Sequence, residues 1–232
     1  MSVKPILFNT DMVRALQDGT KTATRRPVKP HYREGEAGFR VVTNKHTGQY
    51  VRIEIFDEWE DETRWLNEPY RPGDILYVRE TWRVQSARRF DADARIMFKV
   101  GGDMVRIQFP GGGTQYHSRR QYDAFVSKWA DDRWHPSIHM PREAARIFLR
   151  VTGLRVERLR KIDGRGILAE GIDNGSSNPA MGKRFENMQR MAFQRLWDST
   201  IKKADRALYG WTANPWVWVI SFELISREEA EL

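Results

Sequence analysis

The sequence predicts a mixed α+β domain or a mixed β-barrel that is closed by its last strand. Short strand patterns stand near both ends of the chain, "ILF" at 6–8 and "WVWVISFELI" at 216–225, and helical patterns lie between them. Hydrophobic residues make up 40% of the 232 residues and charged residues 30%, which is typical of a globular protein and excludes a disordered one.

The N-terminal elements are predicted from capping and turn residues. After the strand at 6–8, Asn9 or Thr10 is suited to cap a helix, and Gly19 is suited to end it. The segment "DGTKTATRRPVK" at 18–29 therefore starts just past a helix and enters a loop or a strand.

The remaining elements follow from alternation, turn pairs and helical spacing. Residues 31–72 look irregular apart from one alternating strand at 51–56. The other expected elements, in chain order, are a strand at 75–84, a hairpin at 94–109 turning at Gly101-Gly102, a helix at 119–130, a strand at 144–159 that is continuous or interrupted near Gly153, helices through "DGRGILAEGI" and "GKRFENMQRMAFQRLWDST", and the final strand.

The net charge favours an acidic partner. Lys and Arg number 39 and Asp and Glu 31, so the formal charge is +8. Several basic groups would be able to contact phosphates, although such groups are more often solvated surface; they are Arg88-Arg89, Arg119-Arg120, Lys202-Lys203 and the run Arg155, Arg158, Arg160 and Lys161.

Three classes of site or location are not expected. The chain has no cysteine, which excludes disulfides and thiolate metal sites and is compatible with a reducing cytosol. His135 and His139 are four residues apart, but Pro136 opposes the helix that would align them, so no metal or other cofactor is expected. "MSVKPILFNT" lacks the apolar run of a signal peptide and "WVWVI" is too short to cross a bilayer, so we expect a soluble, cytoplasmic protein without a membrane partner.

The segment "TKTATRR" at 20–26 holds the residue types of a candidate active site. In an extended chain Thr22, Thr24 and Arg26 face one way and Lys21 and Arg25 the other, and a bend would bring Lys21 toward Thr24. A hydroxyl becomes a nucleophile when a base takes its proton, and lysine is such a base only when burial or neighbouring cations lower its pKa. No carboxylate stands nearby in the sequence, so the segment alone fits a basic loop as well as an active site.

The order of the motifs resembles the ASCH domain family of the PUA-like superfamily. The resembling motifs are "ILF" followed by a helix and "GTKTATRR", then "PGDILYVRETW", "LAEGI" and "NPWVWVISFEL". The resemblance covers 5–30, 71–84, 136–172 and 193–225, and the arrangement is similar to longer phage and prophage members. It implies a single domain over 1–232, a small β-barrel with flanking helices and insertions at about 31–70 and 85–134.

The resemblance also implies a chemistry. Pockets of this family are associated with RNA, DNA or modified nucleosides, and one small bacterial member is an N4-acetylcytidine amidohydrolase. By motif, its lysine proton acceptor corresponds to Lys21, its threonine nucleophile to Thr24 and its glutamate proton donor to Glu170 of "LAEGI". Lys21 would take the proton of Thr24, Thr24 would attack the acyl carbonyl, and Glu170 would protonate the departing amino group. Arg26 or a backbone amide would stabilise the oxyanion.

Further residues are expected to bind the substrate. Trp82 or Trp211 would stack on a nucleobase, and Glu80 would accept hydrogen bonds from an amino group. The alternative is that Trp82 belongs to a core and Glu80 pairs with a nearby arginine such as Arg142. The substrate-binding set expected from the sequence is Arg25, Arg26, Glu80, Trp82, Arg142 and Trp211.

Two other functions remain open at this level. The leading hypothesis is removal of an acyl group from N4 of a modified cytidine, as a nucleoside or within a nucleic acid, with RNA favoured over DNA. The alternatives are a non-catalytic RNA- or DNA-binding ASCH module and a nuclease, for which no metal cluster gives support.

Overall fold

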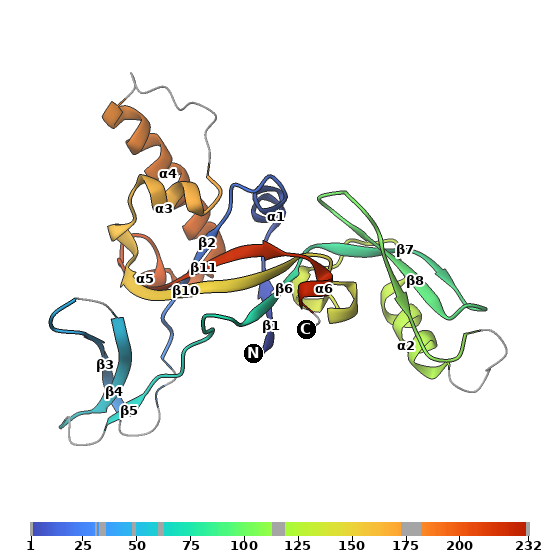
Figure 1. Cartoon of the computed structure of the whole chain (residues 1–232), viewed down its shortest axis with the longest axis horizontal. Coiled ribbons are helices and arrows are strands. Elements are labelled where there is room, and N and C mark those ends of the chain that lie inside the picture. The colour runs from blue at the N-terminus through green and yellow to red at the C-terminus, as the bar shows by residue number, and fades with distance from the viewer. Residues whose placement is uncertain are drawn as a thin grey trace. The chain divides into compact units, whose positions relative to one another are not determined.

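The computed structural model describes residues 2–30, 32, 36–47, 50–59, 63–112, 119–172 and 182–230, with only the backbone at 182–185. The fold is a mixture of helices and several sheets, which confirms the predicted α+β class (Figure 1). The described strands do not close into a barrel. The chain forms two compact units, the first from Met1–Gly19, Asp74–Arg150 and Glu223–Leu232, the second from Thr20–Gly73 and Val151–Phe222.

The first unit contains two sets of strands. β1 (Val3–Leu7) pairs in parallel with β6 (Ile75–Arg79), and the start of β10 (Phe148–Arg158) pairs antiparallel with β6. A separate antiparallel sheet is formed by β7 (Trp82–Arg88), β8 (Asp93–Phe98) and β9 (Val105–Gln108). Its helices are α1 (Thr10–Gln17), α2 (Arg120–Trp129), α6 (Arg227–Ala230) and the short 3-10 turns Ser137–His139 and Arg142–Ala144.

The second unit contains the segment with the "TKTATRR" motif. β2 (Ala23–Pro27) pairs antiparallel with β11 (Trp216–Ile225), and β10 lies on the other side of β11. A second antiparallel sheet is formed by β3 (Glu36–Thr43), β4 (Tyr50–Asp57) and β5 (Thr63–Trp65). Its helices are α3 (Gly164–Ala169), α4 (Gly182–Thr200), α5 (Arg206–Tyr209) and the 3-10 turns Leu159–Lys161 and Lys203–Asp205.

Each unit has its own hydrophobic core. In the first unit Trp82, Ile96 and Phe98 from the β7–β9 sheet pack with Met140 and Phe148. In the second unit α3 and α4 lie side by side (Figure 1). Apolar residues of both helices pack with Val217 and Val219 of β11. The members of this second core are Leu159, Ile162, Ile167, Phe193, Trp197, Ile201, Val217 and Val219. None of the described helices is both long and apolar enough to span a bilayer.

The helix before the motif begins and ends as the sequence predicts. The side chain of Asn9 accepts a hydrogen bond from the backbone N–H of Met12 at 2.9 Å, which is an N-cap of α1. Gly19 has φ +70°, a conformation that glycine adopts without steric cost, and it turns the chain from α1 toward β2.

Most other predicted elements are also confirmed, and two predictions are wrong. The strands at 51–56 and 216–225, the hairpin at 94–109 and the helix at 119–130 are present. The predicted strand at 75–84 is interrupted at Glu80-Thr81, because β6 pairs with β1 while β7 pairs with β8. The described residues between 31 and 72 contain three strands and not one.

The missed strand β3 is defined by its partner and not by alternation. It contains Gly38, and a Cβ at this position would lie 2.8 Å from Cζ of Phe56 on β4. The phenyl ring therefore occupies the space of the missing side chain. The predicted insertions at 31–70 and 85–134 contain most of the two separate three-stranded sheets, and parts of both insertions lie outside the described residues.

Candidate active site

The "TKTATRR" motif is joined directly to the end of α3. Lys21 forms an antiparallel β-bridge with Glu170, and the N–H of Thr22 donates to the carbonyl of Ala169 at 2.9 Å. Glu170 is the C-cap residue of α3, and its N–H donates to carbonyls within that helix. The bridge therefore brings together two motifs that are 149 residues apart.

The ammonium group of Lys21 is buried and bonds to three oxygens. Nζ donates to Oε2 of Glu170 at 2.8 Å, to the carbonyl of Glu170 at 3.0 Å and to the carbonyl of Ala23 at 2.9 Å. An ammonium has three donors, so these contacts use all of them. The side chain exposes 0% of its surface, and the lysine is therefore held as the cationic partner of a buried carboxylate.

Glu170 lies between two cations. Oε2 accepts from Lys21, and Oε1 accepts from Nη1 of Arg25 at 3.3 Å. Arg25 is held in turn by Glu157, whose Oε1 accepts from Nε at 3.0 Å and from Nη2 at 2.8 Å. A Cβ on Gly166 would lie 2.8 Å from Nη2 of Arg25, so this glycine of α3 leaves the space that the guanidinium fills.

Burial and charge act in opposite directions on the pKa of Lys21. Removal from water lowers this pKa below the ordinary 10.5, because desolvation disfavours the charged form. Glu170 raises the pKa by its charge and its hydrogen bond, while Arg26 and Arg25 lower it by repulsion. The net effect is a lowered pKa, so Lys21 gives up its proton more readily than a lysine in water.

Thr24 lies inside β2 and is 1% exposed. It stands opposite Ile220 of β11, while Ala23 and Arg25 stand opposite Ser221 and Val219. Because side chains alternate along a strand, Thr24 and Arg26 lie on one face of β2 and Ala23 and Arg25 on the other.

Arg26 and Trp211 are partly buried. Burial lowers the pKa of Arg26, and the charges of Glu170 and Tyr70 oppose this shift. Trp211 packs edge-on against Phe193 with ring centroids 5.9 Å apart, beside the core of the second unit. Both residues belong to the same unit as Lys21, Thr24 and Glu170.

The other three expected binding residues belong to the first unit. Trp82 is 0% exposed and lies in the core, stacked on Phe125 with centroids 6.1 Å apart, so it presents no free ring face. Both oxygens of Glu80 accept from Arg146 at 2.9 Å, and Arg146 takes the position that the sequence assigned to Arg142. Arg142 is exposed and lies over the ring of Tyr77 at 5.9 Å. The alternative stated for these two residues, in which Trp82 belongs to a core and Glu80 pairs with an arginine, is the arrangement in the structure.

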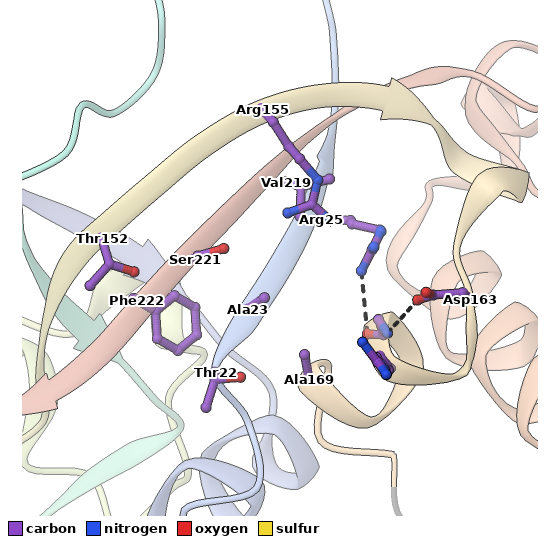
Figure 2. Close-up of a pocket in the computed structure, with 12 residues that line it drawn as sticks. Thr22, Ala23, Arg25, Thr152, Arg155, Asp163, Ala169, Val219, Ser221 and Phe222 are labelled. Atoms are coloured by element: carbon purple, nitrogen blue, oxygen red, sulfur yellow. Dashed lines mark hydrogen bonds between the residues drawn. The ribbon is translucent and has the colours of Figure 1, made fainter. Parts of the chain in front are cut away.

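A pocket of about 400 Å³ opens beside Arg25, which belongs to the buried ion pairs (Figure 2). Figure 2 shows Arg25 extending from β2 toward α3, where a dashed line marks its 3.4 Å hydrogen bond to the Gly166 carbonyl. The lining consists of neighbours of the three predicted catalytic residues and not of those residues themselves: Thr22, Ala23, Arg25, Thr152, Arg155, Asp163, Arg165, Gly166, Ala169, Val219, Ser221 and Phe222.

Several residues of this region are not predictable from the motif. Glu157 and Gly166 position Arg25, and Arg165 and Ser221 line the pocket. The alternation in "TGLRVER" at 152–158 places Arg155 and Glu157 on one face of a strand, which is the signal available in the sequence. That signal does not identify β11 and β2 as the neighbouring strands.

The described residues contain no group of three or more His, Cys, Asp or Glu side chains placed to hold a metal ion. In comparisons with known proteins, no family model, no curated protein and no solved structure matched the chain. The interpretation of the site therefore rests on the geometry of its own residues.

Proposed function

We propose that the chain is an ASCH-type, PUA-like protein that hydrolyses the amide of an N4-acylated cytidine. The observation that supports this function is the 2.8 Å contact between Nζ of Lys21 and Oε2 of Glu170. Lys21 lies three residues before Thr24 in the sequence. A lysine with a lowered pKa and a carboxylate in direct contact supply a base and an acid at one place.

The pair prepares both catalysts in one proton transfer. Moving the proton from Nζ of Lys21 to Oε2 of Glu170 leaves a neutral amine and a neutral carboxylic acid. Burial lowers the pKa of Lys21, which favours release of its proton. The amine is then able to accept a proton, and the acid is able to donate one.

The proposed reaction uses these two groups and the hydroxyl of Thr24, with the roles that the motif resemblance implies. Lys21 takes the hydroxyl proton while the oxygen attacks the acyl carbon, and the C–N bond breaks as Glu170 protonates N4 of cytosine. The pair has then returned to ammonium and carboxylate. A water molecule cleaves the acyl-threonine ester: its OH goes to the acyl carbon, which releases the carboxylic acid, and its other proton goes to the oxygen of Thr24. The Arg26 guanidinium, on the same face of β2 as Thr24, stabilises the oxyanion.

The test is the release of cytidine from N4-acetylcytidine, followed by chromatography. We expect turnover by the parent chain, a loss of about 10²-fold or more in Thr24→Val, and substantial activity in the matched variant Thr24→Ser, which keeps a hydroxyl. Turnover by Thr24→Val at the parent rate would rule out the nucleophile, and no turnover by the parent would reject the function.

A further inference from the structure

Two small side chains, Ala23 and Ser221, line the pocket in the second unit from neighbouring strands. Ser221 of β11 stands opposite Ala23 of β2, and a Cβ on Gly153 of β10 would lie 3.8 Å from Cβ of Ser221. Ala23 and Ser221 thus leave room at the pocket. The volume of the pocket is about 400 Å³, which suits a small ligand.

Two arginines at this pocket have donors that the described part of the chain does not use. Arg155 is 53% exposed, and its recorded bond joins Nε to Oε2 of Glu157 at 3.3 Å, so the terminal nitrogens remain available. Arg165 on α3 is exposed, and within the described part of the chain no carboxylate lies within ion-pair distance of it. The hydroxyl groups of Thr22, Thr152 and Ser221 also line the pocket.

The charges around the pocket are unequal. The cations are Lys21, Arg25, Arg155 and Arg165, and the carboxylates are Asp163, Glu157 and Glu170. Glu170 and Glu157 are already bonded to Lys21 and Arg25, and Oδ1 of Asp163 caps α3 by accepting from the N–H of Gly166 at 2.8 Å. The surplus positive charge therefore lies at the exposed arginines.

We propose that this pocket binds a phosphate group, with Arg155 and Arg165 as its ligands and the lining hydroxyls as further donors. A guanidinium presents paired N–H donors that match phosphate oxygens. Arg155 keeps its terminal nitrogens for a phosphate while Nε bonds to Glu157, and Arg165 has no carboxylate within ion-pair distance among the described residues. The phosphate belongs to a nucleotide, either free or within a nucleic-acid strand.

This site does not depend on deacylation. Ala23, Arg25 and Ser221 line the pocket, whereas Thr24 faces away from it along β2. Phosphate binding is therefore measurable whether or not N4-acetylcytidine is hydrolysed, and the two proposals fail separately.

The test is calorimetric titration of the whole chain with cytidine, cytidine monophosphate, inorganic phosphate and a short single-stranded RNA. We expect the monophosphate to bind at least about tenfold more tightly than cytidine, and its affinity to fall as salt rises. Arg155→Gln/Arg165→Gln should remove this difference. If RNA binds more tightly than the monophosphate, the phosphate belongs to a nucleic-acid strand. If the two bind equally, the phosphate belongs to a free nucleotide.

The matched control is Arg158→Gln/Arg160→Gln, which removes the same charge from neighbouring exposed positions outside the pocket lining. It should bind the monophosphate as the parent does. Equal affinity for cytidine and its monophosphate, unchanged binding by the pocket variant, equal weakening by the control or no binding of any phosphate compound would each overturn the proposal. Urea denaturation of both variants verifies that they are folded.

Discussion

Each unit holds a buried carboxylate in contact with a cation, but the cations differ. In the first unit Glu80 accepts two hydrogen bonds of 2.9 Å from Arg146, and the guanidinium also lies 4.1 Å from the ring centre of Phe98. In the second unit Glu170 bonds to Lys21 at 2.8 Å and to Arg25 at 3.3 Å. Both carboxylates are almost completely buried, at 1% and 3% exposure.

The difference between the two pairs is chemical and not geometric. A guanidinium keeps its proton at any accessible pH, so the Glu80–Arg146 pair is restricted to holding the structure together. A buried lysine is able to release its proton, and its carboxylate partner is able to receive it. The type of cation therefore separates a structural pair from one that is suited to catalysis.

The largest expected effect comes from making the second pair resemble the first. Lys21→Arg keeps the charge beside Glu170 but cannot release a proton, so we expect hydrolysis of N4-acetylcytidine to fall about 10²–10⁴-fold. Lys21→Met introduces a side chain smaller than arginine and should lose the same activity, so the size of arginine would not explain the loss. Single-turnover kinetics measures the loss, and retention of the parent rate by Lys21→Arg would contradict the role of Lys21 as a base.

Removing the cation should destabilise the first unit more than the second, although the catalytic effect is expected only in the second. Arg146→Met leaves Glu80 without its cation and should lower the free energy of unfolding by about 3–5 kcal/mol. Lys21→Met should cost only about 1–3 kcal/mol, because Arg25 still bonds to Glu170. Urea denaturation measures both, with the exposed Arg142→Met as the control. A larger cost for Lys21→Met than for Arg146→Met would show that Arg25 does not compensate.

The smallest effect is a shift in the pH dependence of hydrolysis. The pair is active while it holds one shared proton, so activity falls at alkaline pH when Lys21 loses that proton, at a pH below the ordinary 10.5. Arg26 lowers the pKa of Lys21, so Arg26→Gln should raise it and move the alkaline limb to higher pH. Loss of the oxyanion contact lowers the rate at every pH, and the position of the limb in kcat/KM is therefore the relevant measurement. Arg142→Gln should leave the limb in place; a limb that moves to lower pH in Arg26→Gln contradicts the sign.

Local signals in the sequence predict elements with a cap, a turn or clear alternation. Asn9 and Gly19 delimit α1, and "WVWVISFELI" is β11 over its whole length. Predictions are wrong where pairing decides the structure: β3 follows from the fit of Phe56 against Gly38, and the break at Glu80-Thr81 follows from a change of partner strands.

For the site, the sequence indicates residue types and the fold determines what they contact. The motif resemblance named Lys21 and Glu170, which the β-bridge brings together. Trp82 and Glu80 lie two residues apart in "VRETW", but the first enters a core and the second bonds to Arg146. No local pattern distinguishes a buried tryptophan from one that stacks on a ligand, because both are apolar and aromatic.

The pairing of β2 with β11 has a consequence for synthesis of the chain. Residues 23–27 leave the ribosome about 200 residues before their partners at 217–221, and at about 5–20 residues per second this takes on the order of ten seconds or longer. Until then β2 cannot pair with β11, and the bridge between Lys21 and Glu170 cannot form before Glu170 has been synthesised. The candidate active site is therefore completed only after Glu170 and β11 have been synthesised, and substitutions that weaken β11 should act on the yield of folded protein as well as on its stability.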